Sequence, residues 1–211
     1  MSGAQAHQRN ATDARKLPVG GTPYSIARDL GGLRERSIAM VGRREATNVL
    51  AVKTSSNRAM LVAADGYTGY AQALRDVQPS HENSQKDADH VVASKSRQAA
   101  DLKFVAIASV PKEINRGHGA TFEKPASPLR VDANGKIWMS SHQAAKLAGL
   151  APEEVKGVRY ARDQESNDVF QAGMSVSQRE DIQKALTFEI SEVSKPLTWL
   201  SALQAEFKVN S

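Results

Sequence analysis

Short runs of apolar residues alternate with polar turns through the first third of the chain, a pattern that predicts β-strands. Three such runs lie at residues 38–41, 49–52 and 60–63, and the turns between them are charged or rich in serine and asparagine. Residues 67–77 follow with apolar side chains three and four positions apart, which is the spacing of one helix face. The pattern therefore predicts a small sheet with a helix packed against it.

The two ends of the chain have different patterns. Residues 1–20 are rich in small and polar residues without apolar periodicity, which is typical of a disordered arm. Thr22 followed by Pro23 is a helix start, and residues 140–211 contain segments with helical apolar spacing. We therefore expect an α+β protein in three parts, with an arm at 1–20, an α+β body at 21–139 and a helical C-terminal region at 140–211.

The most distinctive stretch runs from Ala88 to Ala120 and combines two apolar runs with polar motif residues. The runs at 91–93 and 104–110 are separated by a polar loop, which predicts a β-hairpin. Asp89 and His90 precede the first run, and the segment 115–119 follows the second. The hairpin would therefore gather a carboxylate, an imidazole and an amide at one end.

These three groups suit hydrolysis assisted by one metal ion. A neutral imidazole accepts a proton from water, whereas a carboxylate and an amide oxygen are hard ligands for a divalent cation such as Mg²⁺. Consecutive residues on a strand point to opposite faces, so Asp89 and His90 act together only if the strand begins or bulges at this pair. We therefore expect a break in the strand there.

The sequence Asp89-His90-Val91-Val92, followed by Asn115-Arg116-Gly117, resembles the HNH (ββα-metal) nuclease motif. It is most similar to the version in the HNH module of CRISPR-associated DNA nucleases. The similarity covers about 30 residues of the chain. It departs from the family pattern at Ala93, where a proline often stands, and in the proline-containing segment after His118, which favours a short metal-bearing helix.

The resemblance implies a role for each motif residue. His90 would be the general base, and Asp89 and Asn115 would hold one Mg²⁺ or Mn²⁺ ion. His118 would fill the third motif position, which in the wider family is often a metal-binding histidine. Arg116 lies inside the motif, where a cation beside the scissile phosphate would offset transition-state charge.

Composition excludes several classes of protein. The 211 residues include no cysteine, which excludes a disulfide scaffold and a thiolate zinc site. No apolar run approaches the length of a membrane span, and the N-terminus lacks the apolar core of a secretory signal. We therefore expect a cytoplasmic protein of a bacterium or a phage-infected cell, or a toxin exported without a cleaved signal, and no membrane partner.

The charge distribution favours nucleic acid as the partner, and the resemblance to the HNH module implies that this nucleic acid is DNA. Residues 1–162 carry 24 Lys and Arg against 15 Asp and Glu, whereas residues 163–211 carry 4 against 8. A basic body is expected of a protein that approaches phosphate backbones. The candidate phosphate contacts lie at strand ends and around the motif: Arg43, Arg44, Lys95, Arg97 and Lys112.

Two other functions fit parts of the chain. Residues 141–162 resemble a helix-turn-helix in outline, which would make the protein a non-enzymatic DNA-binding protein with Lys156, Arg159 and Arg162 in the major groove. Alternatively, the hairpin is only scaffold in a structural phage or plasmid component. Residues 175–207 predict two helices whose apolar faces pack on the body or bind a second copy or an inhibitor protein.

Overall fold

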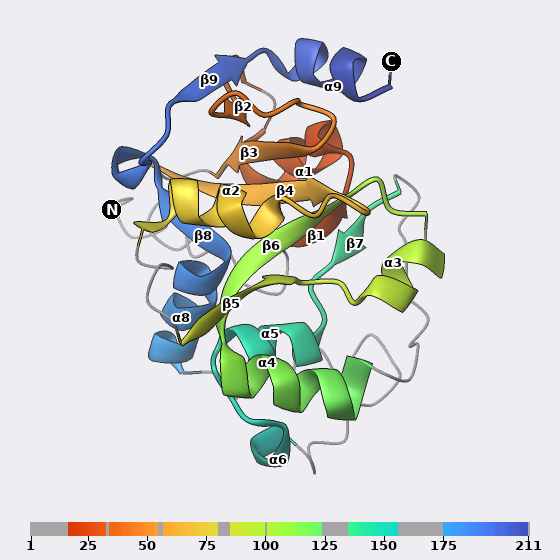
Figure 1. The fold of residues 1–211 in the computed structure, drawn as a ribbon, viewed down its shortest axis with the longest axis vertical. Helices are drawn as coiled ribbons and strands as arrows, with labels where there is room; N and C mark the ends of the chain where they lie inside the picture. Colours follow the sequence, from red (N-terminus) through yellow and green to blue (C-terminus); the bar gives the residue numbers. More distant parts are fainter. Residues whose placement is uncertain are drawn as a thin grey trace, which may run out of the picture.

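The computed structural model of the chain describes residues 17–32, 34–54, 57–79, 85–99, 101–123, 135–155 and 175–210. Its strands are β1 (Pro18–Gly21), β2 (Ile38–Val41), β3 (Val49–Lys53), β4 (Arg58–Ala64), β5 (Lys86–His90), β6 (Phe104–Pro111), β7 (Ile137–Trp138), β8 (Thr187–Glu189) and β9 (Leu197–Leu200). They form one antiparallel sheet in the order β7-β1-β6-β4-β3-β2-β9, with β5 paired to β6 and β8 paired to β4 (Figure 1).

Helices cover both faces of this sheet. They are α1 (Pro23–Gly31), α2 (Tyr70–Val77), α3 (Ser94–Ala99), α4 (Lys112–His118), α5 (Ser141–Leu147), α6 (Pro152–Val155), α8 (Val176–Leu186) and α9 (Ala202–Asn210), with a π-helical turn η3 (Gly119–Glu123) and a 3-10 turn η4 (Ile190–Glu192). In Figure 1, α2 lies in front of the sheet and α1 behind it, while α4, α5 and α6 gather at the lower end. Within the described ranges, no helix is both long enough and apolar enough to cross a membrane.

Strand β6 organises the sheet because it pairs with three other strands. Its residues 104–105 pair with β1, residues 104–107 with β4, and residues 107–111 with β5. Beyond Ile107, β4 pairs with β8 instead. The β5–β6 ribbon therefore extends past the main sheet, and it is contacted by α2 as well as by α4.

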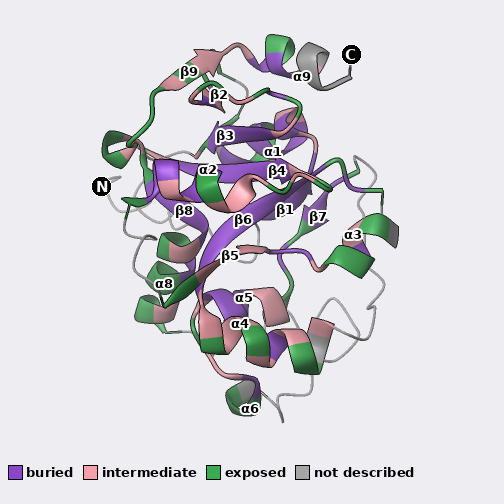
Figure 2. Ribbon diagram, viewed as in Figure 1, coloured by how far each residue is buried: buried purple, intermediate pink, exposed green. Residues whose placement is uncertain are grey.

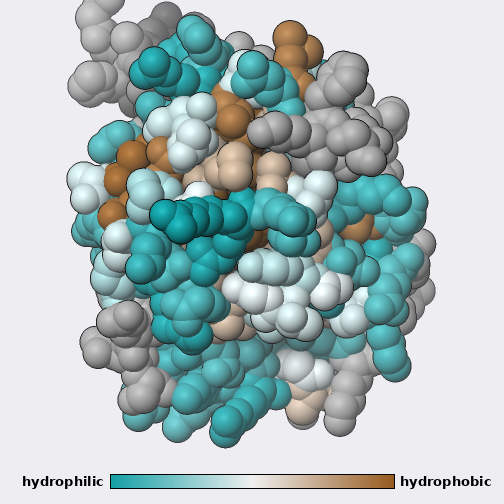
Figure 3. All heavy atoms as spheres, turned by 45° about the horizontal axis from the view of Figure 1, so that its top comes forward, coloured by the Kyte–Doolittle hydropathy of each residue, from teal (hydrophilic) through white to brown (hydrophobic). Residues whose placement is uncertain are grey.

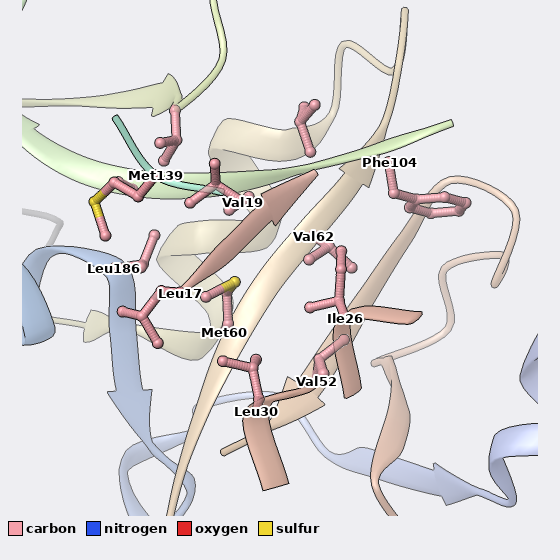
Figure 4. Packing of buried hydrophobic residues seen from close by; sticks show 14 of the residues in the cluster. Leu17, Val19, Ile26, Leu30, Val52, Met60, Val62, Phe104, Met139 and Leu186 are labelled. Atoms are coloured by element: carbon pink, nitrogen blue, oxygen red, sulfur yellow. The ribbon is translucent and has the colours of Figure 1, made fainter. Parts of the chain in front are cut away.

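Alternate residues of the central strands face two separate cores. Met60 and Val62 of β4 belong to the larger core, with side chains from α1, α5, α8 and α9. Leu61 and Ala63 face the smaller core beneath α2, and both sets are buried (Figure 2). Figure 4 shows the larger core, in which Ile26 of α1 packs beside Val62. Because both faces of the sheet are covered, consecutive residues of β4 are all buried, and alternate side chains differ only in which core they enter.

Several predicted elements are confirmed, as is the mixed α+β class. The three apolar runs form β2, β3 and β4, and the residues with helical spacing form α2. Helix α1 begins at Pro23, and the Thr22 side chain accepts a hydrogen bond from the backbone N–H of Ser25. Proline at the first position and threonine as the cap therefore act as expected.

The two terminal regions differ from the prediction. Residues 18–20, assigned to a disordered arm, lie in the buried strand β1, while residues 1–16 lie outside the described residues. The C-terminal region is not only helical, because β8 and β9 join the sheet. The apolar spacing of Leu197, Leu200 and Leu203 suggested one helix, but it spans a strand and the start of α9. Pairing with the edge of β2 satisfies backbone groups that a lone strand would leave open.

The hairpin also differs in its first strand. Strand β5 ends at His90 instead of beginning there, and residues 91–93 form a bend followed by α3. Val91 and Val92 are buried in the core all the same. The turn sequence Asp132-Ala133-Asn134-Gly135 also predicts a hairpin at 129–139. Residues 129–134 lie outside the described residues, and β7 pairs with β1.

Apolar side chains on the surface are few. On the face shown in Figure 3, they form small patches separated by hydrophilic residues. The large hydrophobic side chains exposed among the described residues are Trp138, Val176 and Leu203, which come from β7, α8 and α9. The expected contact of the C-terminal helices with a second copy or an inhibitor stays a prediction.

The N-terminal cap of α5 offers a test of local stability. Ser140 accepts a hydrogen bond from the backbone N–H of Gln143, whose side chain accepts one from the backbone N–H of Ser140. Ser140→Ala is expected to lower the free energy of unfolding by about 1 kcal/mol, because the first turn loses an acceptor. Urea unfolding measures this loss, and Ser191→Ala at an exposed serine in η4 serves as the control. Equal effects of the two substitutions would contradict the capping role.

Candidate functional site

The stretch that carries the motif folds as two antiparallel strands, separated by the short helix α3 and followed by helix α4. Strand β5 pairs with β6 along its whole length, and the chain passes from Pro111 directly into α4. Helix α4 contacts both strands and carries Asn115 and His118. The Asn115 Nδ2 group donates a hydrogen bond to Asp87 Oδ2 at 3.3 Å. This bond places α4 over the face of β5 that carries Asp87.

Asp89 lies two residues after Asp87 and therefore on the same face of β5. Its Oδ2 accepts a hydrogen bond from Lys146 Nζ of α5 at 2.6 Å, and the same ammonium donates to Glu123 Oε1 at 2.6 Å. The Lys146 side chain is only 3% exposed. Burial acts to lower the pKa of Lys146, but the Asp89 and Glu123 carboxylates outweigh it and raise that pKa above its ordinary value. The lysine is therefore charged at neutral pH.

His90 faces the other side of the ribbon. Its ring lies 4.2 Å, centroid to centroid, from the ring of Tyr70 in α2. Asp89 pairs with Ala108 and His90 with Ile107, so the register is regular and the two side chains point to opposite faces. The strand ends at this pair, but it neither begins nor bulges there, so the two side chains are not brought together. The structure thus brings Asp89 and Asn115 to one face and places His90 on the other.

The environment of the His90 imidazole is unusual for a buried polar group. Its Nε2 is buried and has no hydrogen-bond partner among the described residues. Burial, followed by the nearby Arg97 guanidinium, lowers the pKa of His90 to about 4. The ring is therefore neutral at neutral pH. An unpaired buried nitrogen is costly, and such groups are concentrated at functional sites.

His118 is held by the backbone. It is 1% exposed, and its Nε2 lies 2.8 Å from the carbonyl oxygen of Leu150. Because a carbonyl only accepts, Nε2 carries the proton in this contact and is not available to a metal. Burial lowers the pKa of His118 below its ordinary value. Within the described ranges, no three His, Asp or Glu side chains are grouped closely enough to form a metal site by themselves.

The candidate phosphate contacts fall into two groups. Arg44 Nη2 forms an ion pair with Asp76 Oδ2 at 2.6 Å, and Arg97 is paired with Asp65. By contrast, Lys95, Arg116 and Arg43 are exposed, while Lys112 is half-buried. The first group therefore serves the fold, and the second remains in a position to meet a ligand.

These groups predict different effects on binding. Lys95→Ala is expected to weaken DNA binding and reduce its salt dependence by about one phosphate contact, because an exposed ammonium is lost. Arg44→Ala is expected to lower the free energy of unfolding by about 1–2 kcal/mol, because Asp76 loses its charged partner. Fluorescence anisotropy at several salt concentrations and urea unfolding measure the two effects. A lower salt dependence in Arg44→Ala would contradict this division.

The helix-turn-helix prediction is described only in part. Helix α5 and helix α6 are separated by a short turn with Gly149 at φ +76°, which favours glycine. Lys156, Arg159 and Arg162 lie outside the described residues.

The sequence prediction missed three residues near Asp89, namely Asp87, Lys146 and Glu123. Asp87 had a signal, since it stands two positions before Asp89 and a strand places both on one face. Lys146 had a weaker one, as a lysine among the small and apolar residues of α5. Glu123 had none, because its place depends on the π-helical turn that continues α4.

Comparison with known proteins found no relative of this chain. No family model matches the sequence, and no curated protein or solved structure shows significant similarity to it.

Proposed function

We propose that the protein is a metal-dependent endonuclease of the HNH type that hydrolyses phosphodiester bonds of DNA. The observation that carries this proposal is the β5–β6–α4 unit, in which Asp87, Asp89 and Asn115 belong to one face of a two-stranded ribbon covered by a helix. The short helix α3 lies between the two strands, and the part that resembles the motif is the antiparallel β5–β6 ribbon followed by α4. The basic charge of residues 1–162 supports a phosphate-rich substrate.

The donor atoms of this face suit Mg²⁺ or Mn²⁺. Two carboxylates and an amide oxygen are hard ligands, and Mg²⁺ in proteins uses one or two carboxylates completed by water and substrate phosphate. Asp89 and Asn115 would hold the ion, with Asp87 beside them. When bound, it would stabilise negative charge on the leaving oxygen. A cation is already drawn to Asp89, namely the Lys146 ammonium.

His90 would accept the proton of the attacking water, for which its neutral imidazole is in the required state at neutral pH. This role requires the end of β5 to turn, so that the imidazole reaches the side of Asp89. Two features favour such a turn. His90 is the last residue of the strand, next to the bend at Val91, and its unpaired Nε2 would gain a partner by leaving its present position.

Cleavage of supercoiled plasmid by the purified protein tests this function. Nicking is expected with Mg²⁺ or Mn²⁺ and not with EDTA, and it should be lost in His90→Ala and in Asp89→Asn. Glu192→Gln, at an exposed residue of η4, serves as the control and should cut like the wild type. If every variant leaves the plasmid intact but shifts it equally on a gel, the non-enzymatic DNA-binding function replaces this proposal.

A further inference from the structure

Lys146 connects three elements through one ammonium group. From α5 it reaches Asp89 on β5 and Glu123 on η3, and both N–O distances are 2.6 Å. The side chain is nearly closed off from solvent, at 3% exposure. Two carboxylate oxygens around one positive charge are the ligands that a divalent cation would also seek.

The charges around Asp89 leave room for only one cation on its Oδ2 atom. Asp89 and Glu123 share this ammonium, and Asp87 lies two residues before Asp89 on the same face of β5, so the carboxylates near Asp89 outnumber the one positive charge between them. The Lys146 ammonium offsets one of these charges. A divalent ion on Asp89 would lie within a few ångströms of this ammonium, and two cations at that separation in a buried site repel strongly.

We propose that the Lys146 ammonium occupies the cation position of the Asp89 carboxylate, and that a divalent ion binds there by displacing it. This inference rests on the proposed function for the identity of the ion. Without the ion, the Lys146 ammonium neutralises part of the charge of Asp89 and Glu123. The affinity for a divalent ion is lower because the ion must displace this ammonium in order to bind. The opposite possibility is that Lys146 positions Asp89 for the metal, in which case its loss would weaken binding.

Binding of Mn²⁺ to the full-length protein without DNA, followed by the spectrum of the free ion or by calorimetry, separates these possibilities. Lys146→Met is expected to bind Mn²⁺ at least tenfold more tightly than the wild type, because the competing charge is gone. The double variant Asp89→Asn with Lys146→Met should lose this gain. The matched control is Lys136→Met, since Lys136 is also buried and paired with an acid, Asp29, but lies outside the cluster. It should bind Mn²⁺ like the wild type.

A second variant keeps the test decisive if Lys146→Met does not fold. Lys146→Gln removes the competing charge but keeps a hydrogen-bond donor for Asp89 and Glu123, so Mn²⁺ affinity should again rise at least tenfold. An unchanged or lower affinity in both variants would overturn the inference.

The displacement of Lys146 and the nuclease function can fail independently of each other. If Lys146→Met binds Mn²⁺ tightly but no variant cuts DNA, the displacement stands and the nuclease proposal fails. If the wild type cuts DNA with dependence on His90 while Lys146→Met binds no better, the nuclease stands and the displacement fails.

Discussion

Lys146→Met is expected to lower the free energy of unfolding by about 3–5 kcal/mol when no divalent cation is present. The substitution leaves Asp89 and Glu123 without their cation in a site where the lysine side chain is 3% exposed. Buried carboxylates without a partner are either desolvated at high cost or forced to take up protons. Urea unfolding in EDTA measures the loss, and the midpoint of thermal unfolding should fall by roughly 10 °C for a chain of this size.

An exposed lysine provides the control for this result. Lys103 pairs with Asp101 at 3.2 Å, and the two side chains are 63% and 87% exposed. Lys103→Met should therefore change the free energy of unfolding by less than about 1 kcal/mol. A similar small loss in Lys146→Met would show that water reaches the buried cluster. Adding Asp89→Asn and Glu123→Gln to Lys146→Met should recover part of the stability, because the unpaired charges are removed as well.

Acidification is expected to destabilise the protein through His90. The pKa of this residue is about 4 in the folded state and 6.5 in the unfolded chain, so unfolding takes up a proton between these two values. Stability is therefore complete above pH 6.5, falls as the pH falls towards 4, and levels off below that for this group. The contribution lost between pH 7 and pH 4.5 is about 2–3 kcal/mol.

Comparison with His90→Gln isolates this contribution. Urea unfolding at pH 7 and at pH 4.5 should show a smaller loss of stability in the variant than in the wild type, by the amount given above. Some acid sensitivity will remain, because burial also lowers the pKa of His118 and of His142. Identical pH dependence in the wild type and the variant would mean that His90 is accessible to water.

Local patterns predicted much of the sheet and the helix starts. The apolar runs of β2, β3 and β4 lie between clear turn sequences, so hydrophobic period and turn chemistry agree there. The helix start at Thr22 was also predicted, because a cap depends on residues within one helical turn. Where all relevant interactions are local, the sequence was sufficient.

The parts that were missed depend on distant partners. Leu197–Leu200 is a strand because the edge of β2 is available to it, which no local pattern reveals. Likewise, strand β5 extends back to Lys86 because β6 continues to Pro111, and this pairing fixes Asp89 and His90 on opposite faces. The motif residues were predicted to gather at one end of a hairpin, but a shift of the strand by a few positions decided which of them share a face.

The pairing of β9 with β2 also has a consequence for synthesis of the protein. Ile38 pairs with Leu200, so the outer edge of β2 receives its partner only after almost all of the described chain has left the ribosome. Until then, a nascent chain with β2, β3 and β4 already paired presents an open strand edge, the kind of surface through which growing chains associate wrongly. Late release of the C-terminal segment therefore leaves this edge open to association between growing chains until β9 covers it.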